Sequence, residues 1–123
     1  MYTITKQFEF SASHRLDRLP EEHKCFALHG HNYTVTIELQ SGYIDKMGFV
    51  IDYGQLQPFK DWLDQTFDHK HLNDVVEFHP TAENLAIYIY EKWHDNTLFS
   101  KIKLTAVTVQ ETPKTSATWR IAS

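Results

Sequence analysis

Apolar and polar residues alternate along four stretches of the chain, and a period of two is typical of β-strands. The alternation predicts strands over residues 2–13, 31–41, about 102–111 and 116–121. A short apolar run from Phe49 to Ile51 predicts a further short strand in the connection after the second one. Residues 15–28 are mostly polar and contain Pro20, so we expect a loop there.

Two stretches between the second and third long strands have the 3.6-residue period of amphipathic helices. The first is expected from about 54 to 66, with Asp52 as its cap and Pro58 in its first turn. The second is expected to start at Thr81 as N-cap, with Glu83 near the positive end of the helix dipole, and to end at Asp95. The order strand, strand, helix, helix, strand, strand predicts an α+β fold, a four-stranded antiparallel sheet with both helices on one face.

Composition and charge narrow the class of protein. The chain has 123 residues, 41% of them apolar and 14% aromatic, which predicts a single folded domain over residues 1–123. A net charge of −4 offers no general attraction to nucleic acid. Apolar and aromatic residues also occur on the second face of the predicted sheet, which favours oligomerisation. With one cysteine, no long apolar run and no cationic leader, we expect a cytoplasmic protein without a membrane anchor.

Three histidines converge in this scheme. His29 and His31 share the apolar parity at the start of the second strand, with Cα atoms about 6.5–7 Å apart. His14 ends the first strand on its apolar parity, and antiparallel pairing would bring it beside the other two. Three neutral imidazoles suit zinc better than magnesium or calcium. The alternative is three strand-end histidines that bind backbone groups.

Other candidate residues each have more than one interpretation. Cys25 is a buried apolar side chain, a fourth ligand of a closed zinc site, or a thiol that moves protons. Asp68 and His69 are a carboxylate that orients an imidazole, or parts of a solvated loop. Glu111 is an edge residue in water or an anchor for a ligand with several N–H donors. His71 is expected to be solvated or structural. The remaining histidines have no placed partner and are expected at the surface: His23, His79 and His94.

Several short motifs together resemble the 6-pyruvoyltetrahydropterin synthase family. They are Ala12-Ser13-His14-Arg15-Leu16, Cys25 followed after three residues by His29-Gly30-His31, Ile51-Asp52-Tyr53, Asp68-His69, Leu72-Asn73-Asp74, Pro80-Thr81-Ala82-Glu83-Asn84-Leu85 and Glu111-Thr112. The three-residue interval between Cys25 and His29 resembles the bacterial branch that forms 6-carboxytetrahydropterin in the queuosine pathway.

The resemblance implies a tunnelling fold in a homohexamer, with three sheets joined edge to edge and active sites between subunits. It implies zinc on His14, His29 and His31, Cys25 as proton acceptor with Asp68 and His69 as its relay, and Glu111 on the pterin ring. Thr81, Glu83 and Thr112 would assist at the pterin pocket, and Arg15 and Lys24 are candidates for the triphosphate.

The implied reaction converts 7,8-dihydroneopterin triphosphate to 6-carboxy-5,6,7,8-tetrahydropterin, acetaldehyde and triphosphate. Three alternatives remain open at this point. They are formation of the 6-pyruvoyl product from the same substrate, another pterin reaction in the same pocket, and a non-catalytic domain stabilised by zinc.

Overall fold

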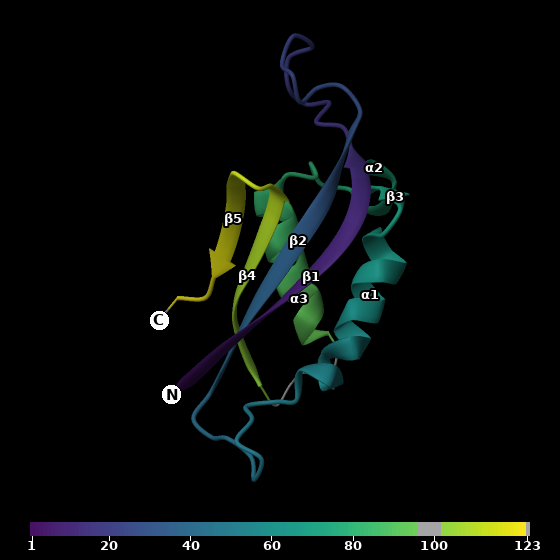
Figure 1. The fold of residues 1–123 in the computed structure, drawn as a ribbon. Helices are drawn as coiled ribbons and strands as arrows, with labels where there is room; N and C mark the ends of the chain where they lie inside the picture. The colour runs from purple at the N-terminus through teal and green to yellow at the C-terminus, as the bar shows by residue number, and fades with distance from the viewer. Residues whose placement is uncertain (96–101, 123) are drawn as a thin grey trace.

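The strands form one sheet with helices on one side of it. A computed structural model describes residues 1–95 and 102–122. The sheet order is β3-β1-β2-β4-β5, from one edge to the other (Figure 1). The strands are β1 (Tyr2–His14), β2 (His29–Ser41), β3 (Lys70–His71), β4 (Lys103–Thr112) and β5 (Thr115–Arg120).

The long pair β1 and β2 is antiparallel in one continuous register, from Tyr2 opposite Ser41 to His14 opposite His29. Burial alternates along both strands, as the sequence pattern predicts. In β2, Tyr33, Val35 and Ile37 are fully buried. This register carries the histidines to one end of the sheet on its buried face.

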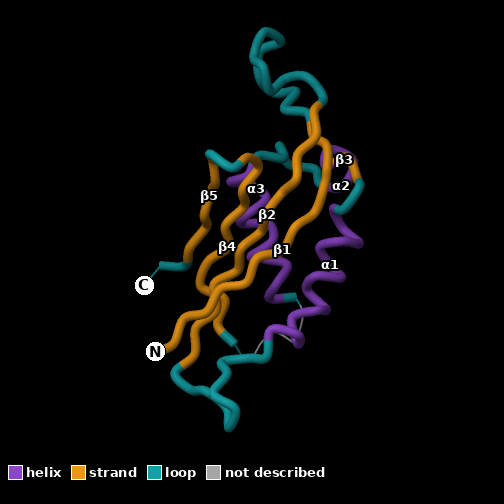
Figure 2. Tube along the Cα trace, viewed as in Figure 1, coloured by secondary structure: helices purple, strands orange, loops and turns teal. Residues whose placement is uncertain are grey.

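The helices cover that buried face (Figures 1 and 2). They are the 3-10 turn η1 (Tyr53–Leu56), α1 (Gln57–Phe67), α2 (Leu72–Val75) and α3 (Ala82–His94). Thr81 caps α3, since its side-chain oxygen accepts the Asn84 N–H, which confirms the expected N-cap. Asp52 caps η1 in the same way, and Pro58 lies at the start of α1, where its missing N–H costs little. The first helix therefore begins with a 3-10 turn.

The predicted number of strands was wrong. The sheet has five strands, because Lys70 and His71 pair in parallel with Ala12 and Ser13 of β1. The expected short strand from Phe49 to Ile51 is irregular backbone. Two-residue pairing leaves no periodic trace in a sequence, and an apolar run of three residues can equally pack as a loop.

The second face of the sheet is more polar than expected, although Ala106 of β4, opposite Glu38, is an apolar residue on it. Every second residue of β1 from Thr3 to Ser13 points away from the helices, and all of them are polar. In β2 the same face holds Thr34, Thr36 and Glu38. Exposed apolar side chains lie instead in the connection before α1, where Tyr43 is 85% and Met47 79% exposed. No helix within the described residues is long and apolar enough to cross a membrane.

Candidate metal centre

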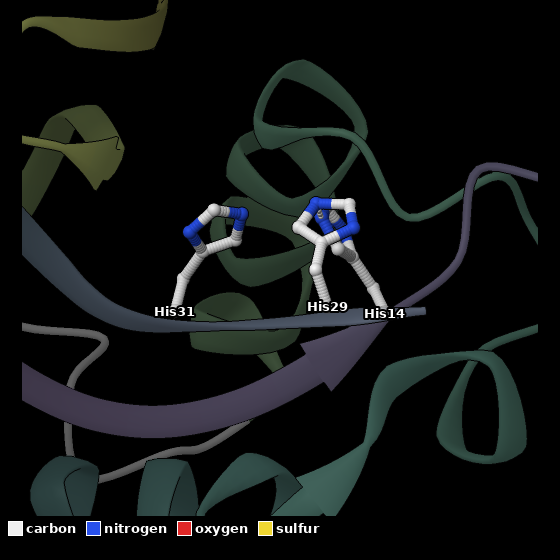
Figure 3. A group of neighbouring side chains, drawn as sticks. All are labelled: His14, His29 and His31. Carbon is white, nitrogen blue, oxygen red and sulfur yellow. Dashed lines mark hydrogen bonds between the residues drawn. The ribbon is translucent and has the colours of Figure 1, made fainter. Parts of the chain in front are cut away.

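His14, His29 and His31 come together at the end of the β1–β2 pair, as predicted (Figure 3). His14 and His29 face each other in the last rung of the ladder, and His31 follows two residues along β2. One ring nitrogen from each residue lies within 4.8 Å of the other two. His14 is completely buried, and the other two are half-buried. The group could therefore hold one metal ion.

Backbone carbonyl groups determine which nitrogen of each ring is free. The Nδ1 atom of His14 lies 2.9 Å from the Pro80 carbonyl, and Nδ1 of His29 lies 2.7 Å from the Ala27 carbonyl. A carbonyl oxygen only accepts, so both Nδ1 atoms carry the hydrogen and both Nε2 atoms keep a lone pair. The Tyr33 hydroxyl oxygen also lies 3.2 Å from Nδ1 of His14.

The free nitrogens face one another. Nε2 of His14 lies 2.9 Å from Nε2 of His29, and Nε2 of His31 is buried without a hydrogen-bond partner. Two lone pairs at that distance repel unless a proton or a cation lies between them. Zinc bonds of about 2.0–2.1 Å at tetrahedral angles set two donors about 3.3 Å apart, close to the spacing here. The donor set and its tautomers therefore fit a metal ion.

Burial favours the neutral form of two of the three rings, those of His14 and His31. Burial, the largest cause, lowers the pKa of His14 from 6.5 to about 4, the bond to Pro80 opposes that change, and the His29 ring adds to it. Burial also lowers the pKa of His31. Neutral imidazole is the form that coordinates metals, so the site needs no proton release from these rings near neutral pH.

A carboxylate adjoins the cluster. Oε2 of Glu111 lies 3.8 Å from Nε2 of His31, and the Glu111 carboxylate accepts the Ala82 N–H at the start of α3. Glu111 and Glu83 line one cavity of about 510 Å³ between α3 and the β4–β5 hairpin. Burial raises the pKa of the Glu111 carboxyl. The cavity thus offers a half-buried acceptor next to the three-histidine cluster.

Cys25 lies in the long loop that rises beyond the ends of β1 and β2 (Figure 2). Its side chain is half-buried. Its N–H donates to Nδ1 of His23, at 3.1 Å, and its carbonyl accepts the Leu16 N–H, at 3.2 Å. Among the described residues, Cys25 makes no hydrogen bond to Asp68 or His69.

Asp68 and His69 form a pair at the outer edge of β1. Oδ2 of Asp68 lies 3.0 Å from Nδ1 of His69, and its Oδ1 accepts the Ser11 N–H at 2.9 Å. That N–H, the largest cause, holds the pKa of Asp68 below its usual range. The His69 side chain is 83% exposed and its backbone has a φ of +57°, a conformation that non-glycine residues rarely adopt. A strained backbone here presents an oriented imidazole to the outside.

The remaining predicted residues have structural contacts. Thr81 caps α3, and the Thr112 hydroxyl pairs with that of Thr115 in the β4–β5 turn. The Arg15 side chain contacts Phe26, and Lys24 is exposed. For His71, Nδ1 lies 3.0 Å from the Ser13 hydroxyl, which favours the structural one of its two expected roles.

Several residues at or near the site were not predicted from the sequence. His23 was expected to have no partner, yet its ring accepts the Cys25 N–H. His79 was expected at the surface, but it is half-buried and its Nε2 is enclosed. The Pro80 carbonyl leaves no mark in a residue pattern, whereas Tyr33 could have been found, because it shares the buried parity with the His pair.

Comparison with known proteins identifies the class. The fold is α+β, and the three-histidine cluster is a candidate metal centre. A family model described as 6-pyruvoyl tetrahydropterin synthase matches residues 3–122. The chain therefore belongs to this family of pterin lyases.

Individual relatives support the same placement. The chain is 31% identical to a 6-carboxy-5,6,7,8-tetrahydropterin synthase of Rickettsia conorii, over 92% of this chain and 96% of the relative. It resembles the structure of Caenorhabditis elegans 6-pyruvoyl tetrahydropterin synthase, with 34% identity, a TM-score of 0.78, and coverage of 98% and 96% of the two chains. An uncharacterised protein of Wolinella succinogenes shares the fold, with a TM-score of 0.83, 22% identity, and 97% of each chain covered.

Proposed function

We propose that this protein is a zinc-dependent lyase that converts 7,8-dihydroneopterin triphosphate to 6-carboxy-5,6,7,8-tetrahydropterin, acetaldehyde and triphosphate, as a step of queuosine biosynthesis. The observation that carries the proposal is the convergence of three imidazole nitrogens, with free Nε2 lone pairs on His14 and His29, beside the cavity that contains Glu111. The carboxy product is the one named for the Rickettsia relative.

His14, His29 and His31 would hold the zinc. When bound, zinc supplies Lewis-acid polarisation of the substrate's side-chain oxygens, which makes the adjacent C–H more acidic. The Pro80 and Ala27 carbonyls keep His14 and His29 in the tautomer that this role needs.

Glu111 would hold the pterin ring. A carboxylate accepts two N–H groups of an amino-pyrimidine edge side by side. The Ala82 N–H fixes the carboxylate of Glu111, and Glu83 lines the same cavity. Thr81 supports this arrangement as the cap of α3, and Thr112 as part of the turn that closes the cavity's β-hairpin wall.

Cys25 would accept the proton from the substrate side chain, and Asp68 and His69 would relay it. Since Cys25 makes no hydrogen bond to that pair among the described residues, we assign the pair to the site of a second copy. The strained, outward-facing His69 supports this assignment.

Assembly into a homohexamer would complete the sites. Within the described residues, β3 pairs with the outer edge of β1 only at Ala12 and Ser13, and no strand pairs with the outer edge of β5. Open edges of this kind pair with further strands. The exposed apolar residues of the 43–53 connection supply additional contact surface.

The test is turnover of 7,8-dihydroneopterin triphosphate by the zinc-loaded protein, with acetaldehyde and the pterin product both measured. We expect acetaldehyde and the carboxy product from the parent, and neither from Cys25→Ala. The exposed residue His94 provides a control variant, His94→Ala, which should retain turnover. A pyruvoyl product without acetaldehyde would instead support the activity named for the C. elegans relative. Bound zinc without turnover would overturn the proposal.

A further inference from the structure

The loop over residues 15–28 is attached to the sheet at its first residue. Beyond His14, the β1 backbone continues into Arg15, and β3 has already ended its pairing at Ser13 and His71. The Asn73 side chain takes over at that point. Its Oδ1 accepts the Arg15 N–H at 2.8 Å, and its Nδ2 donates to the Arg15 carbonyl at 2.8 Å. Asn73 therefore adds one more rung to the edge of the sheet.

The Arg15 side chain connects this rung to the far end of the loop. Its Nε donates to the Phe26 carbonyl at 3.3 Å, and its guanidinium carbon lies 5.1 Å from the centre of the Phe26 ring. A guanidinium plane stacks on an aromatic ring and donates at its edge at the same time, which an ammonium group cannot do.

The two ends of the loop are joined a second time next to this contact. The Leu16 N–H donates to the Cys25 carbonyl at 3.2 Å. The residues on both sides of Arg15 thus have fixed neighbours. His14 belongs to the three-histidine cluster, and the Leu16 N–H binds the Cys25 carbonyl. Contacts run without a gap from Asn73 through Arg15 to Phe26 and Cys25.

We propose that Asn73 and Arg15 are positioning residues that hold Cys25 at a fixed place relative to the three-histidine cluster. The catalytic consequence rests on the proposed role of Cys25, whereas the positional claim does not. Arg15 then acts within the protein, in contrast to the phosphate contact that its charge and location suggest from sequence.

Asparagine is needed at position 73 because one side chain must both accept and donate. The substitution Asn73→Asp would keep the acceptor but place a carboxylate oxygen against the Arg15 carbonyl. The substitution Arg15→Lys keeps the charge but loses the stacking plane and the edge donor. Arg18→Lys is the matched control, because Arg18 lies in the same loop and its guanidinium contacts the Glu77 carbonyl instead.

The first readout is the rate at which iodoacetamide alkylates the protein. The reaction is followed as loss of the free thiol, and because Cys25 is the only cysteine, that loss reports on this residue alone. We compare the plateau values that these rates reach at high pH. Loss of a contact of this kind shifts a local opening equilibrium by roughly fivefold, so we expect about fivefold faster alkylation for Asn73→Asp and Arg15→Lys. Arg18→Lys should match the parent.

The second readout separates positioning from substrate binding. Positioning predicts that Arg15→Lys lowers kcat by about fivefold with KM unchanged and zinc content at the parent's level. A raised KM with unchanged kcat and unchanged alkylation would overturn the inference in favour of a triphosphate contact. Alkylation rates within twofold of the parent for Arg15→Lys would also overturn it. If Asn73→Asp fails to fold, Arg15→Lys, at an exposed position, still tests whether this contact positions Cys25. Alkylation needs no turnover, so failure of the proposed reaction would be seen separately.

Discussion

The substitution Tyr33→Phe removes the hydroxyl oxygen that lies next to His14 in the candidate metal centre. Tyr33 is fully buried, and its ring stacks on Phe10 with centroids 5.0 Å apart and an interplanar angle of 9°. Phenylalanine keeps that stacking. The change therefore removes only the hydroxyl oxygen that lies 3.2 Å from Nδ1 of His14.

The expected loss of zinc affinity is small because Nδ1 of His14 keeps a second acceptor, the Pro80 carbonyl. The Pro80 carbonyl is closer to Nδ1, at 2.9 Å, so the tautomer with a free Nε2 survives the substitution. The loss is one long hydrogen bond to an orienting group, about 0.5–1.5 kcal/mol. A free-energy change of 1.36 kcal/mol corresponds to a tenfold change in an equilibrium constant, so zinc affinity should fall by about two- to tenfold. This is at the low end of the effects known for residues that hydrogen-bond to metal ligands.

Competition with a fluorescent chelator measures this affinity. Tyr90→Phe makes the same chemical change on α3, where the Tyr90 ring packs on Trp119, and should leave zinc affinity unchanged. A Tyr33→Phe affinity equal to that of the control would refute the reasoning that the hydroxyl helps to orient His14. A loss beyond a hundredfold would refute the claim that Pro80 alone preserves the tautomer.

Three further substitutions test other parts of the structure. Glu111→Gln should lower kcat/KM by about 10- to 100-fold with zinc content unchanged, because a charged hydrogen bond contributes about 1.5–3 kcal/mol; steady-state kinetics with metal analysis measures both. Glu38 accepts the Thr105 hydroxyl, the largest cause of its lowered pKa, and pairs with Arg120. Its contribution is therefore present above the usual pKa of 4.5 and lost as pH falls through the lowered value, so the urea midpoints of Glu38→Gln and parent should differ at pH 7 and converge in acid. Leu85→Ala, at a fully buried position of α3, should lower the free energy of unfolding by about 2–5 kcal/mol in the same assay.

Alternation in the sequence was enough to predict the main sheet and the clustering of His14, His29 and His31. Because side chains in a strand have a period of two, the parity shared by His29, His31 and Tyr33 determines that all three face the helices. His14 followed from the same rule and from antiparallel pairing. The caps Asp52 and Thr81 could be predicted because a side-chain oxygen just before a helix accepts an N–H of its first turn, a contact between residues close in sequence.

Other parts of the site depend on contacts between distant segments. Pro80 binds His14 across 66 residues through a carbonyl group that every residue possesses. Asn73 binds Arg15 through the direction of its amide, and β3 has only two residues. The left-handed backbone of His69 is stabilised by its N–H bond to the Ser11 carbonyl, and no residue type marks it. None of these features has a period that a sequence could display.

The central claim is an open centre of three histidines with Cys25 nearby but not coordinated. X-ray absorption at the zinc edge of the loaded protein tests it most directly. We predict imidazole nitrogens and an additional oxygen or nitrogen at about 2.0–2.1 Å, with no sulfur in the coordination shell. A sulfur at about 2.3 Å, absent in Cys25→Ala, would contradict the account and indicate a closed structural site.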